Sequence, residues 1–128
     1  MTRGSGGCSA GLTRTVTQIT ATTPLQFFNA LSDIKLGDEI FFERFSNSDN
    51  TRRIDHGNMH CISNNGTTRS FVGVTIYYIG GSSYVIGKKL NVTTDKIYID
   101  YLSTYGNNMS EVNMTFASCV NAYKIIYT

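Results

Sequence analysis

Both histidines of the chain, one of its three cysteines and a carboxylate lie between Asp55 and Cys61. Imidazole, thiolate and carboxylate groups are zinc ligands, and a Cys/His pair can also act as a hydrolase nucleophile. In an extended chain, however, His60 and Cys61 point to opposite faces, so the two cannot bind one ion without a bulge. We therefore predict a solvated loop that leads to an inward Cys61, with no metal and no cofactor. A zinc site is the alternative.

A second group of titratable residues surrounds a turn signal at Gly37. Paired carboxylates at such a point could perform acid/base chemistry on a sugar. We predict structural roles instead: Asp38 stabilises the turn after Gly37, and Glu43 faces solvent or pairs with a basic neighbour. The chain is accordingly predicted to have no catalytic residues and not to be an enzyme. The carboxylates of this group are Asp33, Asp38, Glu39 and Glu43.

The aromatic residues are more informative, because the chain has eight tyrosines and no tryptophan. A tyrosine buries its ring while its hydroxyl stays in water, which suits a recognition surface or a subunit interface. Tyr84, Tyr101 and Tyr105 lie nearest to predicted turns, and Asn107 shares the polar 103–110 loop with Tyr105. We predict that these four residues bind a ligand.

These residues must be positioned by a fold that the composition indicates. Thr, Ser, Asn and Gly fill about two-fifths of the 128 positions, which favours short strands joined by tight turns. The net charge of +2 is small and the basic residues are scattered, which argues against a nucleic-acid partner. No apolar run is long enough to predict membrane insertion.

One helix is predicted over residues 24–32. Thr23 can cap it, Pro24 suits its first position, and Gln26 completes a capping box. Phe27 and Phe28 would then lie on the face that it buries.

Short runs of alternating apolar residues, separated by turn signals, predict the strands. A long polar loop is expected at 46–57. The pair Asn65 and Gly66 indicates a type I′ hairpin turn, and a further turn is expected at Gly87 and Lys88. The expected strands cover residues 12–21, 39–45, 59–63, 68–79, 83–86, 89–92, 96–102, 111–117 and 122–127. We therefore predict an all-β fold, an antiparallel sandwich or barrel of about eight short strands with one short helix.

Five of the seven phenylalanines lie within nineteen positions, at 27, 28, 41, 42 and 45. In the 39–45 strand, Phe42 alternates with Phe41 and Phe45, so both faces of the strand are apolar. If Phe42 faces the main core, Phe41 and Phe45 need cover on the other side. We expect the helix to provide it, and a neighbouring subunit is the alternative.

Residues 1–11 are rich in Gly and Ser and are predicted to form a flexible arm, with residues 12–128 as a single β domain. The first seven residues lack the apolar core of a signal peptide, so synthesis in the cytoplasm is expected. The cysteines Cys8, Cys61 and Cys119 show no metal-binding spacing and are expected to be thiols.

From Thr67 onward, the short Tyr/Thr/Gly strands that end in Tyr123, Lys124, Ile125, Ile126, Tyr127 and Thr128 resemble the small β-domains of tailed-phage virion proteins. Fibre heads and capsid decoration proteins belong to this group. The resemblance implies a bacteriophage structural protein, made in the host cytoplasm and attached to the virion as a homo-oligomer. Its expected partners are itself, other virion proteins and a host-surface glycan or receptor. A lectin-like or secreted effector module is the alternative.

Overall fold

The computed structural model describes residues 12–45, 53–79, 81–101, 111–113 and 120–128. The strands form one antiparallel sheet in the order β1-β8-β2-β3-β4-β5-β6-β7. The predicted all-β fold class, with about eight antiparallel strands and one short helix, is therefore confirmed. In chain order the elements are β1 (Arg14–Ile19), α1 (Pro24–Ala30), β2 (Glu39–Phe45), β3 (Arg53–Asn64), β4 (Thr68–Ile79), β5 (Ser82–Thr93), β6 (Ile97–Tyr101), β7 (Glu111–Asn113) and β8 (Val120–Tyr127).

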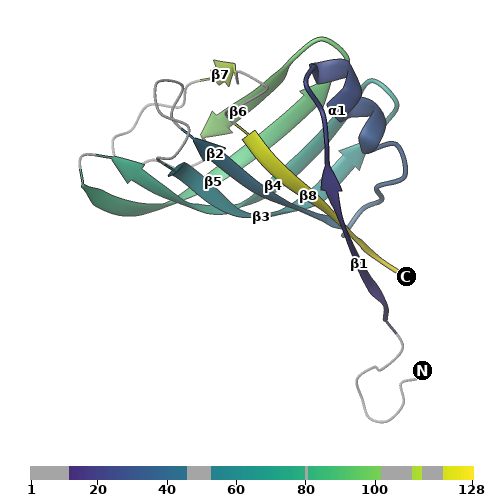
Figure 1. The fold of residues 1–128 in the computed structure, drawn as a ribbon, viewed down its shortest axis with the longest axis horizontal. Helices are drawn as coiled ribbons and strands as arrows, with labels where there is room; N and C mark the ends of the chain where they lie inside the picture. The colour runs from purple at the N-terminus through teal and green to yellow at the C-terminus, as the bar shows by residue number, and fades with distance from the viewer. Residues whose placement is uncertain (1–11, 46–52, 80, 102–110, 114–119) are drawn as a thin grey trace.

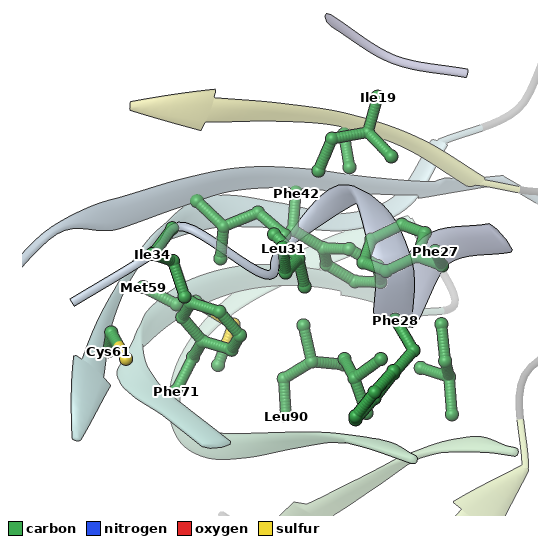
Figure 2. Close-up of a cluster of buried hydrophobic side chains, with 14 of the residues drawn as sticks. Ile19, Phe27, Phe28, Leu31, Ile34, Phe42, Met59, Cys61, Phe71 and Leu90 are labelled. Carbon is green, nitrogen blue, oxygen red and sulfur yellow. The ribbon is translucent and has the colours of Figure 1, made fainter. Parts of the chain in front are cut away.

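The sheet is strongly curved, and α1 lies on its concave side (Figure 1). We call the side that faces α1 the inner face and the opposite side the outer face. The core fills the space between the helix and the inner face (Figure 2). The core side chains that Figure 2 labels are Ile19, Phe27, Phe28, Leu31, Ile34, Phe42, Met59, Cys61, Phe71 and Leu90.

In the part of the chain that the structure describes, no helix is long and apolar enough to cross a membrane.

Two glycines allow adjacent strands to approach closely where the sheet bends. A Cβ atom added at Gly73 would overlap the carbonyl oxygen of Asn58, and one added at Gly57 would lie 2.7 Å from that of Val74. Both contacts are with backbone, which cannot rotate away as a side chain does. Glycines within strands are a known means of curving a sheet. The close approach of β3 and β4 at these two positions therefore requires glycine.

The helix begins as its sequence predicts. The Thr23 hydroxyl accepts a hydrogen bond from the Gln26 amide, and Pro24 occupies the first turn. The Gln26 side chain accepts from the backbone amide of Thr22, one residue before the cap. The first bond satisfies a backbone donor that the first turn of a helix leaves open, and the second fixes the chain where it enters the helix.

A buried carboxylate holds the turn between α1 and β2. Asp38 is 2% exposed, and it accepts hydrogen bonds from the Lys35 ammonium at 2.9 Å and the backbone N–H of Tyr127 at 3.1 Å. Gly37, at φ 91°, provides the left-handed residue of the turn. The predicted role of Asp38 is confirmed, and this residue also fixes the end of β8. Burial by itself would raise the pKa of the Asp38 carboxyl, but the hydrogen bonds from Lys35 and Tyr127 outweigh it and lower the pKa.

The replacement Asp38→Asn is expected to lower the free energy of unfolding at pH 7 by about 1–3 kcal/mol, because charge-assisted hydrogen bonds are lost. Since the folded-state pKa lies below the ordinary value of 3.8, the ionised carboxylate stabilises the fold above that value. This contribution is lost as the pH falls through the folded-state pKa. Urea unfolding from pH 7 to 3 should therefore show the stability difference between wild type and variant shrinking toward acid.

The exposed Asp95 provides a matched control, because Asp95→Asn also removes one carboxylate. Its stability difference from wild type at pH 7 should be small. A difference for Asp38→Asn that stays constant from pH 7 to 3 would contradict the role given to this carboxylate.

Three local predictions were wrong. The expected turn at Gly87 and Lys88 lies inside β5, where these residues pair with Val74 and Gly73 of β4. The expected 46–57 loop is strand from position 53 onward, and residues 46–52 lie outside the described residues. The β3–β4 connection is longer than a two-residue type I′ turn, because Asn64 pairs with Arg69. In the first two cases, pairing along neighbouring strands overrides a dipeptide signal or a polar composition. In the third case, the Asn65 side chain accepts hydrogen bonds within a longer connection.

The expected cover of the second face of β2 was also wrong. The helix packs on the side of Phe42, and Phe41 points to the outer face, where it is half-buried beside His56 and Tyr123. The physical reason is the alternation of β2, since one helix on the inner face cannot reach both sides of a strand.

Candidate interaction surface

The outer face of the β4–β5 hairpin presents apolar side chains to solvent. Val74, Ile76 and Tyr78 alternate along β4 and are 61%, 39% and 38% exposed. Val85, directly opposite Ile76 on β5, is 75% exposed. We call these four residues the hairpin patch. Four adjoining apolar side chains that are exposed on one face make this hairpin a candidate interaction surface.

An aromatic group continues from the hairpin patch toward β2 and β8. The His56 ring stacks on Tyr78 with 5.7 Å between centroids, and its Nε2 lies 2.9 Å from the Tyr78 hydroxyl. Phe41 lies 6.5 Å from the His56 ring and 6.2 Å from the Tyr123 ring. The ring of a tyrosine contributes much contact area at little cost in conformational freedom, so this group extends the surface available to a partner.

A polar cluster borders the aromatic group at Glu39. Its carboxylate accepts hydrogen bonds from the Tyr127 hydroxyl at 2.7 Å and from the Asn58 amide at 2.8 Å. His60 Nδ1 lies 3.9 Å from the same carboxylate. Burial would raise the pKa of Glu39, but the bonds from Tyr127 and Asn58 outweigh it and lower the pKa. The bond to Glu39 in turn raises the pKa of Tyr127.

This cluster is better suited to binding than to catalysis. A carboxylate with a lowered pKa is a poor general acid, and a tyrosine with a raised pKa is a poor base. The Glu39 carboxylate is also only 15% exposed, and both of its oxygens already accept hydrogen bonds. The cluster therefore fixes side chains of β2, β3 and β8 relative to one another and gives the surface a polar border.

The group of titratable residues between Asp55 and Cys61 does not converge. Cys61 points into the core and is 3% exposed, as predicted, whereas His60 lies on the outer face. Burial raises the pKa of the Cys61 thiol, which keeps it protonated and chemically inert. Among the described residues, no group of three or more His, Cys, Asp or Glu side chains could hold a metal ion.

Of the four predicted ligand-binding residues, the structure places Tyr84 and the backbone of Tyr101. Tyr84 is half-buried and alternates with Val85, so it points away from the hairpin patch. Tyr101 ends β6 beside Lys88, about 13 Å along β5 from Tyr84 at the usual rise per residue. Tyr105 and Asn107 lie outside the described residues, as do Cys8 and Cys119.

The sequence contained one signal for the hairpin patch that the prediction did not use. Val72, Val74, Ile76 and Tyr78 are apolar at every second position of a strand whose other side supplies Phe71 to the core. A strand that is apolar on both sides needs cover on both. Tyr84 and Tyr101 were chosen because they lie near predicted turns, and closeness to a turn does not indicate which face of the sheet a side chain occupies.

Comparisons of the chain with protein-family models, curated proteins and solved structures find no match.

Proposed function

We propose that this chain is a non-enzymatic structural protein of a virus particle, a decoration or fibre-tip module of a phage that acts by binding and assembly. The observation that carries the proposal is the hairpin patch, continued by the aromatic group on the outer face. A surface of this type favours association with another protein surface, since burying it removes apolar area from water.

Two further features support assembly over catalysis. The titratable clusters have structural partners: Asp38 fixes a turn, Glu39 is held by Tyr127 and Asn58, and Cys61 is in the core. The composition favours strands and turns with few charges, which is typical of the small β-domains that the sequence resembles. The proposed partners are other copies of the chain and other virion proteins, with a host-surface glycan or receptor as a further partner.

The proposal is tested by identifying the proteins in virus particles whose genome encodes this chain. Particles purified on a density gradient should contain peptides of this chain at a fixed ratio to the capsid protein when they are analysed by mass spectrometry. Genes for capsid or tail proteins should flank its coding sequence. Absence from particles, together with saturable glycan binding by the isolated monomer on a glycan array, would instead favour the lectin-like alternative.

A further inference from the structure

The hairpin patch forms three rows with a regular pattern of side-chain size when Ser83 and Gly87, which flank Val85 on the same face of β5, are added to it. In each of the two end rows, the residue on β4 is larger than its partner on β5: Val74 pairs with Gly87, and Tyr78 pairs with Ser83. The middle row has two aliphatic residues. Ser83 is exposed and Gly87 is half-buried, and each is smaller than the β4 residue with which it pairs. The three rows are Val74 with Gly87, Ile76 with Val85, and Tyr78 with Ser83.

This pattern is self-complementary. Two copies can be placed with their outer faces opposed and related by a two-fold axis. The axis runs parallel to the strands, midway between the two sheets and above the line between β4 and β5, so that β4 of one copy lies over β5 of the second. Tyr78 then faces Ser83 of the second copy, and Val74 faces Gly87. Alternating large and small residues across facing positions is how two sheets interdigitate at their spacing of about 10 Å.

We infer that two copies of this chain pack face to face through the hairpin patch, with β4 of each over β5 of the other. The inference rests on the proposed assembly function and names the partner. It is an isologous interface, in which the same surface serves both copies.

The chemistry of the patch favours a second copy over other partners. None of the six residues in its rows carries a charge, so the patch has no electrostatic preference for nucleic acid or an anionic membrane. An unrelated protein partner would not need the large and small residues to match across the strands of this hairpin. A two-fold copy does need this match, because each row must fit against itself.

The size of the patch sets the expected strength. Two strands and three rows cover roughly 200–300 Å², well below the roughly 800 Å² per partner of a standard stable interface. The pair is therefore expected to be weak, with association visible at micromolar to millimolar concentration. In a particle, attachment of many copies at neighbouring positions would raise the effective concentration.

The first experiment is sedimentation velocity of the full chain over this concentration range. The weight-average mass of wild type should rise from 14.2 kDa toward twice that value. Val85→Glu places a charge in the interface and should raise the dimer Kd by at least about tenfold. Leu36→Glu is the matched control, because Leu36 is 69% exposed and lies in the α1–β2 connection, outside the hairpin patch. It should leave the Kd unchanged.

The second experiment tests the facing of Tyr78 and Ser83. Tyr78→Ser leaves a gap and Ser83→Tyr makes two rings collide, so each should weaken the dimer by about tenfold. The double variant exchanges the two residues and restores one large and one small residue at each contact. Its Kd should return to within about threefold of wild type. Circular dichroism and thermal unfolding verify that each variant folds, as expected for exposed positions.

Three results would overturn the inference: a monomeric wild type at every concentration, a dimer that Val85→Glu leaves intact, or a double variant no better than either single variant. The proposed function is judged separately by the particle analysis. A chain that is present in particles but monomeric in solution would refute the pairing alone. A dimer that is absent from particles would refute the virion role alone.

Discussion

Replacing Phe42 with alanine is expected to lower the free energy of unfolding by about 3–5 kcal/mol. Phe42 is 1% exposed and lies in the core with Phe27, Phe28 and Leu31 of the helix segment (Figure 2). Truncation loses the transfer free energy of the ring and leaves a cavity between β2 and α1. A typical domain is stable by about 5–15 kcal/mol, so this one change removes a large part of the total. Denaturant unfolding at neutral pH measures the effect.

The preceding residue provides a matched control. Phe41 is the same residue type in the same strand, but it lies half-buried on the outer face. Phe41→Ala should cost less than about 2 kcal/mol, because neighbouring rings and solvent already share the space. Equal losses at the two positions, or a loss below about 1 kcal/mol for Phe42→Ala, would show that the helix does not define the core side of β2.

The parts of the fold that could be predicted are those that depend on local chemistry. Thr23, Pro24 and Gln26 specify the start of a helix through bonds within a few residues. The alternation from 39 to 45 gave the bounds of β2 as they are observed. The hairpin before Thr68 was found because Asn65 and Gly66 form a turn signal, and Asn65 accepts hydrogen bonds across that turn.

The features that could not be predicted depend on pairing between distant segments. Gly87 and Lys88 have turn composition, but twelve consecutive pairs with β4 hold β5 extended through them. The beginning of β3 was hidden because Gly57 occupies an inner position and has no side chain to mark the alternation. Which side of β2 is covered by α1 depends on the topology of the sheet. Because Phe41 and Phe42 make both sides apolar, the sequence pattern does not identify the covered side.

The same distinction applies to the candidate surface. The sequence indicated a tyrosine-rich protein that works by binding, but it did not identify which tyrosines share a face. Tyr78 and Tyr123 became candidates only when the sheet order placed β3, β2 and β8 next to one another. The aromatic group draws on β2, β3, β4 and β8, and only the sheet order brings β8 beside β2, so this part of the surface has no local sequence signature.

The second large effect is expected for Arg69→Ala, with a loss of about 2–4 kcal/mol in the free energy of unfolding. Arg69 is 5% exposed, and its Nε donates a hydrogen bond to the Phe28 carbonyl oxygen at 2.9 Å. Its Nη1 donates to the Asn64 side-chain oxygen at 2.7 Å, and its guanidinium lies 3.6 Å above the Phe28 ring. Burial lowers the pKa of Arg69.

The expected loss has a specific cause. The Phe28 carbonyl lies in the last turn of α1, where it accepts a hydrogen bond from the backbone N–H of Leu31 at 3.2 Å and a second one from Arg69. Removing the guanidinium takes the second donor from this carbonyl and the charged donor from the half-buried Asn64 oxygen, and it removes a cation from the negative end of the helix. Arg69→Lys should recover only part of the stability, because an ammonium cannot reproduce the planar fork that reaches both acceptors and stacks on the ring.

A matched comparison comes from the opposite side of the helix end. The ammonium of Lys124 on β8 donates to the Ala30 carbonyl at 2.9 Å and lies 2.8 Å from the carboxylate of Asp33, which is 59% exposed. Lys124→Met should therefore cost less than about 1.5 kcal/mol, since water can reach the groups that it leaves. Denaturant unfolding of Arg69→Ala, Arg69→Lys and Lys124→Met gives the ranking. If Lys124→Met costs as much as Arg69→Ala, the helix end is held by its charge alone and not by the buried guanidinium.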